Sequence, residues 1–164
     1  MSCQLLNRAV NYANYEDFSK DFDKFVYYNK YEVEDRESIK LLKEMIADGK
    51  TVCHLFYEND LPVGLLSLSF ENVGSSDGVA LSITALCVDY LFVSYNFRNK
   101  NFCTCRISHK ILDFAIKTLY DLNNTIGTIN NLILLPANND VKNFYLDYGF
   151  ESLSGEWLYF SIAK

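Results

Sequence analysis

The apolar segment at residues 79–93 constrains the fold more than any other part of the chain. It carries a single charged residue, Asp89. A segment this apolar is typical of a central strand that is covered on both faces. A helical repeat follows at residues 102–122, and a short apolar run then occupies Leu132–Leu135. A strand, a helix and a second strand in this order predict a parallel crossover within one sheet.

Periodicity and turn residues predict the other elements. In chain order they are a helix after Asn14 with an apolar stripe of Phe18, Phe22, Phe25 and Val26, a helix from about Arg36 that ends at Gly49, a hairpin of residues 51–57 and 63–70, a surface loop at Gly74–Gly78, a helix at Asp140–Tyr148 that ends at Gly149, and a strand at Trp157–Ile162. This order predicts an α/β protein in which helices flank a mixed central sheet.

Composition indicates a single domain spanning residues 1–164. The chain is 49% hydrophobic, which is enough for a sizeable core at this length. It has 15 basic and 21 acidic side chains, a formal net charge of -6. Because a broad nucleic-acid face needs positive charge, this balance makes a nucleic-acid partner unlikely. The stretch from Glu16 to Glu37 holds eight acids and four bases and favours a cationic amine instead.

The cysteines and the N-terminal sequence favour a reduced, cytoplasmic protein. The five cysteines contain no C-x-x-C pair, so no metal site is expected. The N-terminal residues lack the charged and apolar regions of a signal peptide. No apolar run approaches the ~20 residues of a membrane span, so no membrane partner is expected.

Positive charge gathers just after the long apolar segment. Between Tyr90 and Leu112 there are four basic residues and no acidic one. The predicted turn from strand into helix lies here, and free amides at a helix N-terminus bind anions. The pattern predicts a site for a phosphate-bearing ligand, with a solvated basic helix face as the equal alternative.

Two motifs in this half of the chain resemble the GNAT superfamily of N-acetyltransferases. Leu91-Phe92-Val93, followed by Arg98-Asn-Lys-Asn-Phe-Cys103, resembles the strand end and the Q/R-x-x-G-x-G/A loop of that family. Asn138-Asn-Asp-Val-Lys-Asn-Phe144-Tyr145-Leu-Asp-Tyr-Gly149-Phe150 is similar to its N-x-x-A-x-x-F-Y-x-x-x-G-F segment. The match covers about residues 86–150 and implies the acyl-CoA N-acyltransferase fold.

The resemblance also implies acetyl-coenzyme A (acetyl-CoA) as co-substrate and assigns site residues. Tyr145 would be the general acid that protonates the departing thiolate, with a packed aromatic ring as its alternative role. The cofactor-binding residues are Leu91, Phe92 and Val93 along the pantetheine, the main-chain amides of Arg98, Asn99, Lys100, Asn101, Phe102 and Cys103 around the pyrophosphate, and the side chain of Asn138.

The loop departs from the family pattern at its two glycines, which are Asn101 and Cys103 here. Bulkier side chains at these places predict weakened binding of the pyrophosphate, and Asn101 is expected in the left-handed backbone region. Asp89 is the first candidate for a general base and Glu71 is the second. For each, an ordinary surface carboxylate is the alternative role.

The sequence therefore predicts an enzyme that transfers acetyl from acetyl-CoA to an amine by direct attack. The acceptor stays open between a small polyamine-like or aminosugar compound and a peptide, and a homodimer is also left open. Two alternatives remain: a degenerate GNAT domain that binds a protein partner, and a toxin of the same superfamily that acetylates tRNA. The acidic composition opposes the toxin, and the missing loop glycines favour the degenerate domain.

Overall fold

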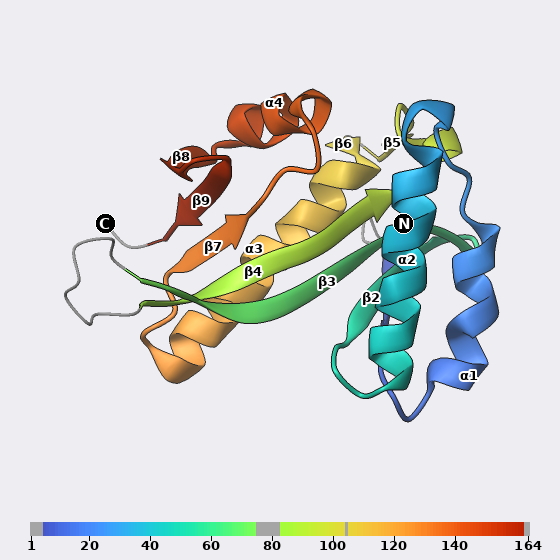
Figure 1. Ribbon diagram of the computed structural model, residues 1–164, viewed down its shortest axis with the longest axis horizontal. Helices are drawn as coiled ribbons and strands as arrows, with labels where there is room; N and C mark the ends of the chain where they lie inside the picture. Colours follow the sequence, from blue (N-terminus) through green and yellow to red (C-terminus); the bar gives the residue numbers. More distant parts are fainter. Residues whose placement is uncertain (1–4, 75–82, 104, 163–164) are drawn as a thin grey trace. The chain divides into compact units, whose positions relative to one another are not determined.

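The computed structural model describes residues 5–74, 83–103 and 105–162, and the chain divides into two compact units. The first unit combines Met1–Ser67 with Tyr90–Leu112, and the second combines Leu68–Asp89 with Asp113–Lys164. Two strands and one helix continue from one unit into the other (Figure 1). That residues 1–164 act as a single domain stays a prediction.

The strands hydrogen-bond in the order β1-β2-β3-β4-β7-β9-β8, and a small second sheet consists of β5 and β6. The elements are β1 (Leu6–Val10), α1 (Tyr15–Phe18), the 3-10 helices η1 (Ser19–Lys24) and η2 (Asn29–Tyr31), α2 (Glu32–Ala47), β2 (Cys53–Glu58), β3 (Leu61–Val73), β4 (Ile83–Val93), the 3-10 helix η3 (Tyr95–Phe97), β5 (Asn101–Phe102), β6 (Cys105–Arg106), α3 (Ile107–Ile126), β7 (Asn131–Leu134), α4 (Asn139–Tyr148), β8 (Glu151–Ser154) and β9 (Trp157–Ser161).

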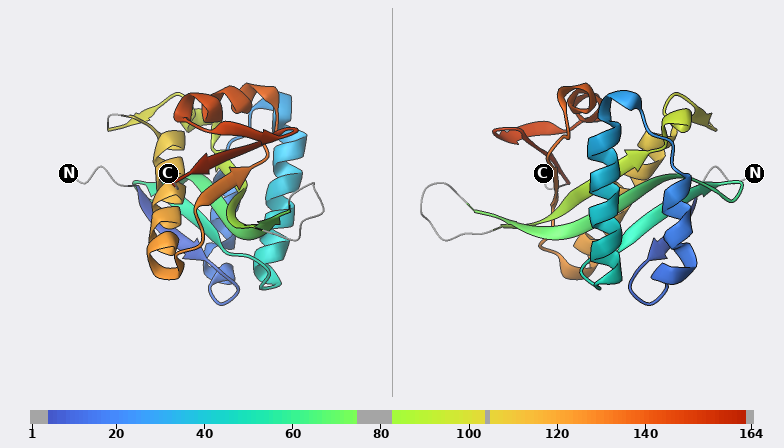
Figure 2. Two further views of the ribbon diagram at one scale, coloured as in Figure 1. Left: turned by 90° about the vertical axis from the view of Figure 1, so that its left-hand side faces the viewer. Right: turned by 45° about the vertical axis from the view of Figure 1, so that its right-hand side comes forward.

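In the first unit, α2 covers the sheet formed by β1, β2 and the beginning of β3 (Figure 2). The predicted hairpin is confirmed: β2 and β3 pair antiparallel through a turn at Asn59 and Asp60, both of which have positive φ. The apolar stripe of α2 is buried at Ile39, Leu42 and Ile46. It packs with strand residues and with Phe92 of β4 in one core cluster.

The predicted first helix is only partly correct. The α-helix stops after Phe18, and η1 carries the chain to Lys24. Phe22 and Phe25 are still buried and meet edge to face at 6.5 Å. Phe25 already has extended backbone, which turns Val26 out of the stripe and leaves it exposed. A 3-10 turn followed by an extended residue therefore satisfies the same apolar spacing as a longer helix.

In the second unit, the predicted parallel crossover is confirmed. β4 pairs parallel with β7, with Leu86 opposite Leu132 and Val88 opposite Leu134. β9 then pairs antiparallel with β7, and β8 pairs antiparallel with β9. The last helix ends as predicted at Gly149, whose φ of 124° suits glycine.

The remaining expectations differ in extent from the structure. The long central strand is β4, which begins at Ile83, and the predicted residues 79–82 lie outside the described part. Of the predicted loop at Gly74–Gly78, only Gly74 is described. The sequence did not predict β1, β8 or the β5-β6 hairpin, which stands where the helix was expected to begin. As a result, α3 starts at Ile107 and not at Phe102.

Candidate active site

Tyr145 lies on the buried face of α4 in the second unit. Its side chain is 7% exposed, and its ring contacts Phe144 at 5.1 Å and Phe150 at 5.6 Å between centroids. Burial raises the pKa of Tyr145 to about 12. The hydroxyl group makes no hydrogen bond to any described residue. It is therefore protonated at neutral pH and can donate a hydrogen bond to a ligand.

Asn138 begins the same helix and acts as its N-cap. Its Oδ1 accepts a hydrogen bond from the main-chain N–H of Val141 at 3.0 Å. This bond satisfies one of the amides that a helix start leaves without a partner. The NH₂ group of Asn138 has no hydrogen bond within the described residues, so the side chain can hold the helix and still donate to a ligand.

Asp89 stands on β4 of the second unit, beside Ser69 of β3. The Ser69 hydroxyl donates to Asp89 Oδ1 at 2.9 Å. Although Asp89 is exposed, partial desolvation of its carboxylate raises its pKa, and the neighbouring Glu71 acts in the same direction. Hydrogen bonds from Ser69 and Cys87 oppose the rise. Asp89 and Glu71, the two base candidates, therefore interact electrostatically on adjacent strands.

The end of β4, Leu91–Val93, belongs to the first unit. Phe92 and Val93 are buried, and Leu91 is half-buried. Gly64 of β3 makes room for this strand end, because a Cβ at Gly64 would stand 2.7 Å from the Phe92 carbonyl oxygen. The Val93 carbonyl accepts a hydrogen bond at 2.9 Å from Arg98 Nε.

The Arg98 side chain is held within the first unit. Besides its bond to Val93, its Nη2 lies 3.7 Å from Asp35 Oδ2, and its guanidinium lies over the ring of Phe92 at 5.4 Å. The sequence had suggested that the basic residues of this turn, Arg98 among them, form a site for a phosphate-bearing ligand. In the structure, such a contact has to compete with Asp35, which sequence reasoning missed because it is one of many acids in residues 16–37.

The main chain after Arg98 also differs from the expected anion loop. The amides of Arg98 and Lys100 donate to the carbonyls of Tyr95 and Phe97, both at 3.2 Å. Asn101 and Phe102 form β5 and pair with Arg106 and Cys105 of β6. The expectation that this loop opens directly into a helix N-terminus is wrong, because the β5-β6 hairpin stands between them.

The left-handed residue of the loop is Cys103 and not Asn101. Cys103 has a φ of 60°, whereas Asn101 lies in a strand and is not among the residues with positive φ. Cys103 is also disulfide-bonded, unlike the free Cys53, Cys87 and Cys105. The expectation of reduced cysteines is therefore wrong at this position.

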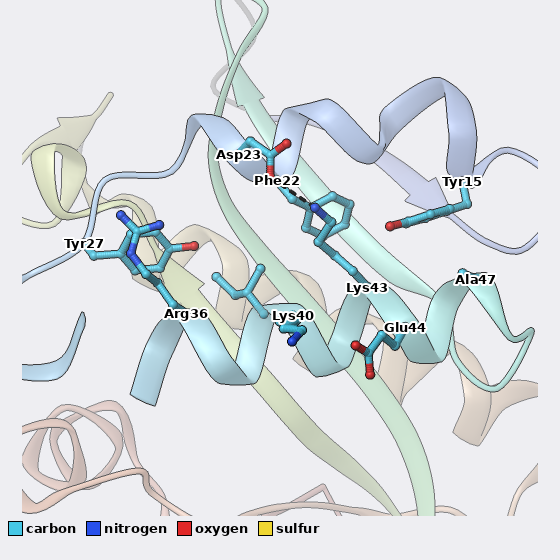
Figure 3. Close-up of a pocket in the computed structure, with 10 residues that line it drawn as sticks. Tyr15, Phe22, Asp23, Tyr27, Arg36, Lys40, Lys43, Glu44 and Ala47 are labelled. Atoms are coloured by element: carbon cyan, nitrogen blue, oxygen red, sulfur yellow. Dashed lines mark hydrogen bonds and ion pairs between the residues drawn. The ribbon is translucent and has the colours of Figure 1, made fainter. Parts of the chain in front are cut away.

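A hollow of about 360 Å³ lies beside α2 in the first unit (Figure 3). Tyr27, Arg36 and Lys43 are among its lining residues, and none of the sequence-predicted site residues lines it. Its charged groups are largely paired: Lys43 Nζ lies 3.1 Å from Asp23 Oδ1, and Arg36 Nε lies 2.9 Å from Glu32 Oε1. The hollow is thus a surface depression bordered by ion pairs.

The structure places the predicted residues in two sets. The first unit holds Leu91–Val93 and Arg98–Cys103, and the second holds Asp89, Asn138 and Tyr145. Within residues 5–74, 83–103 and 105–162, no group of three or more His, Cys, Asp or Glu residues could hold a metal ion. Across the same ranges, no helix is long and apolar enough to cross a membrane.

The sequence matches no family model and no curated protein. Solved structures do match it. AtaT complexed with acetyl-methionyl-tRNAfMet aligns with a TM-score of 0.72 at 15% identity over 96% of this chain and 95% of that one. AtaTR bound with AcCoA aligns with a TM-score of 0.72 at 14% identity over 98% and 95%. A Tyr-to-Phe mutant of KacT aligns with a TM-score of 0.69 at 13% identity over 96% and 95%.

These likenesses extend over nearly the whole chain at low sequence identity. They confirm the fold that the two motifs predicted, a mixed sheet flanked by helices in the GNAT arrangement.

Proposed function

We propose that this protein transfers the acetyl group of acetyl-CoA to an amine. The observation that carries the proposal is Tyr145, a buried and protonated phenol on α4 without a hydrogen bond among the described residues. Two further observations support it. The structure bound with AcCoA shares the fold over 98% of this chain, and the helix that carries Tyr145 ends at the predicted glycine, Gly149.

In the proposed reaction, the amine nitrogen forms a bond to the acetyl carbon as the carbon–sulfur bond breaks. The amine loses one proton and the sulfur gains one. The raised pKa of Tyr145 keeps its hydroxyl protonated before the reaction. As the carbon–sulfur bond breaks, Tyr145 transfers this proton to the sulfur, and the tyrosinate then regains a proton from solvent. Asp89 accepts the proton from the amine. No covalent bond to the enzyme is formed.

Acetyl-CoA would be held by residues of both motifs. The end of β4 at Leu91–Val93 would lie along the pantetheine, the NH₂ group of Asn138 would donate to it, and the loop Arg98–Cys103 would hold the pyrophosphate. Since the amides of Arg98 and Lys100 are engaged in a turn, the phosphate contacts would come mainly from Asn99 and from the exposed Lys100 side chain.

The second candidate concerns the acceptor. The sequence favoured a small cationic amine or a peptide and ranked a tRNA-acetylating toxin last. The structure of AtaT complexed with acetyl-methionyl-tRNAfMet, which matches over 96% of this chain, supports the amino group of an aminoacyl-tRNA as acceptor. The expectation that a nucleic-acid partner is unlikely therefore has no support from the structural comparison.

The test is thiol release from acetyl-CoA with three acceptors: a polyamine, a lysine-containing peptide and an aminoacyl-tRNA. With the accepted substrate, Tyr145→Phe should lower kcat by a factor of about 100 to 10,000 and leave acetyl-CoA affinity nearly unchanged. Tyr120→Phe removes a hydroxyl from an exposed tyrosine on α3 and is the matched control. Equal turnover of the two variants would show that Tyr145 is only a packed ring.

A further inference from the structure

Three cations and five rings contact one another in an unbroken series in the first unit, from Arg36 of α2 to Lys30 of η2. We call this series the aromatic–cation ladder. Its members are, in spatial order, Arg36, Tyr27, Phe92, Arg98, Tyr95, Tyr28, Tyr31 and Lys30. The Arg36 guanidinium lies 4.4 Å above the ring of Tyr27, an arrangement visible in Figure 3. At the other end, Lys30 Nζ lies 5.0 Å from the ring of Tyr31.

Two neighbouring rings of the ladder, those of Tyr28 and Tyr95, are exposed, whereas Phe92 is buried. The rings of Tyr28 and Tyr95 stack with centroids 5.0 Å apart and an interplanar angle of 15°, and the two residues are 37% and 45% exposed. Arg98 lies 5.9 Å from the Tyr95 ring centroid. Tyrosines that served only the core would bury more of their rings. This pair offers ring surface to solvent next to a cation.

Hydrogen bonds hold the two tyrosine-bearing segments together. Ser94 is buried, and its Oγ accepts from the main-chain N–H of Val26 at 2.8 Å. The main-chain N–H of Tyr95 donates to the Val26 carbonyl at 2.7 Å, and Ser94 Oγ donates to Asn96 Oδ1 at 2.9 Å. The stacked pair is therefore fixed before any ligand binds, which lowers the ordering cost of binding.

We propose that the aromatic–cation ladder binds the single-stranded end of an RNA, with bases stacked on Tyr28 and Tyr95 and phosphates beside Lys30 and beside Arg98, where a phosphate takes the place of the Asp35 carboxylate. Proteins bind single-stranded RNA by stacking unpaired bases on aromatic rings and guanidinium planes. Such binding needs few cations, because much of the affinity comes from stacking. An acidic chain of net charge -6 can therefore hold a single-stranded end, although it has too little positive charge to cover a duplex.

The proposal rests on the proposed function in one respect, since it assigns the ladder to the RNA acceptor of that reaction. The binding measurement itself requires no turnover. If RNA binds through the ladder and no acetyl transfer occurs, the ladder stands and the proposed function fails. If acetyl transfer to another amine occurs and RNA does not bind through the ladder, the proposed function stands and the ladder proposal fails.

The test is fluorescence anisotropy with a labelled single-stranded RNA of about eight nucleotides and, as the second probe, a duplex of the same length. Tyr28→Ala and Tyr95→Ala should each weaken single-strand binding by about 5- to 150-fold, the effect of losing one base–ring stack. Tyr95→Phe keeps the ring and should bind as the wild type does. Tyr12→Ala removes a tyrosine that is 70% exposed in the same unit and is the matched control.

Salt dependence supplies a readout that a merely structural role would not produce. With only Arg98 and Lys30 near phosphates, raising salt from 50 to 200 mM should weaken single-strand binding by about sevenfold, far less than for a protein that contacts many phosphates.

The proposal is overturned if both alanine variants bind RNA like the wild type while remaining folded, or if the duplex binds more tightly than the single strand. It is also overturned if the variants lose affinity for acetyl-CoA alone, since the ladder would then serve the adenine of that ligand.

Should the alanine variants fail to fold, Tyr95→Leu and Arg98→Gln replace them in the same measurement, because these residues keep more of the side chain than alanine does while removing the stacking ring or the charge. Unchanged single-strand affinity in both variants would again overturn the proposal. A loss in both would support it.

Discussion

At the scale of a single residue, Asp89 is the proposed general base, and its raised pKa also makes the stability of the protein depend on pH. Its raised pKa means that the folded protein binds this proton more tightly than the unfolded chain does. Stability from this group is therefore complete below the ordinary pKa of 3.8 and is lost as the pH rises through the folded-state pKa. A permanently neutral side chain at this position should avoid that loss.

We accordingly expect Asp89→Asn to raise the free energy of unfolding at pH 7 and to have little effect near pH 3, measured by denaturant unfolding at both values. If Asp89 is also the base, the same variant should lower kcat/KM, and the wild-type rate should fall in acid at a pH above 3.8. Glu71→Gln tests the second candidate in the same assay. A variant of Asp89 that is stabilised but fully active would assign the base to another residue.

Cys103 carries the backbone strain of the loop, because a φ of 60° is unfavourable for a residue with a Cβ. Under reducing conditions, Cys103→Gly should be more stable than Cys103→Ala by about 1 kcal/mol, since both variants lose the thiol and only glycine relieves the strain. Thermal unfolding of the two variants measures the difference. Asn101→Gly should destabilise the protein, because glycine in a strand loses more conformational entropy on folding and relieves no backbone strain at this position. Equal stability of the two Cys103 variants would contradict a left-handed residue here.

At the scale of elements, α4 begins at Asn138, which caps the helix and is proposed to bind acetyl-CoA as well. Asn138→Ala should lower the free energy of unfolding by about 1 kcal/mol, because the N–H of Val141 loses its acceptor. Asn138→Asp keeps an acceptor at the N-cap and should be as stable as the wild type, but it has no NH₂ group to donate. We expect calorimetry to show weaker acetyl-CoA binding by Asn138→Asp. Unchanged affinity would limit Asn138 to its capping role.

Elements with a buried apolar face could be predicted from the sequence. The spacing of Ile39, Leu42 and Ile46 identified α2, and the same logic found the β2-β3 hairpin, β7, α4 and β9. Strands that bury little gave no such signal. β1 is exposed at four of its five positions and β8 at all four, so neither strand shows the alternation of buried and exposed side chains that marks a strand in a sequence. The two-residue strands β5 and β6 are too short to show any period, and for that reason the start of α3 was placed too early.

At the scale of the whole molecule, the predicted site residues are divided between the two units. The sequence identified its motif residues because they resemble a family pattern in type and spacing. The sequence did not show which contacts these side chains already make within the protein. The Arg98 side chain pairs with Asp35, and Asn138 caps its own helix. Such contacts depend on residues that lie far apart in the chain or on capping geometry, and a motif specifies neither of these. The aromatic–cation ladder, assembled from residues 27–36 and 92–98, was missed for the same reason.

The central claim, that this fold binds acetyl-CoA, is tested most directly by a thermal-shift titration of the purified full-length protein. At 100 times its dissociation constant, a ligand that binds only the folded state stabilises it by about 2.7 kcal/mol. We predict a saturable rise in the unfolding temperature with acetyl-CoA and no rise with acetate. Absence of any shift at millimolar acetyl-CoA, in a sample that unfolds cooperatively, would contradict the account and favour a degenerate domain that binds a protein partner.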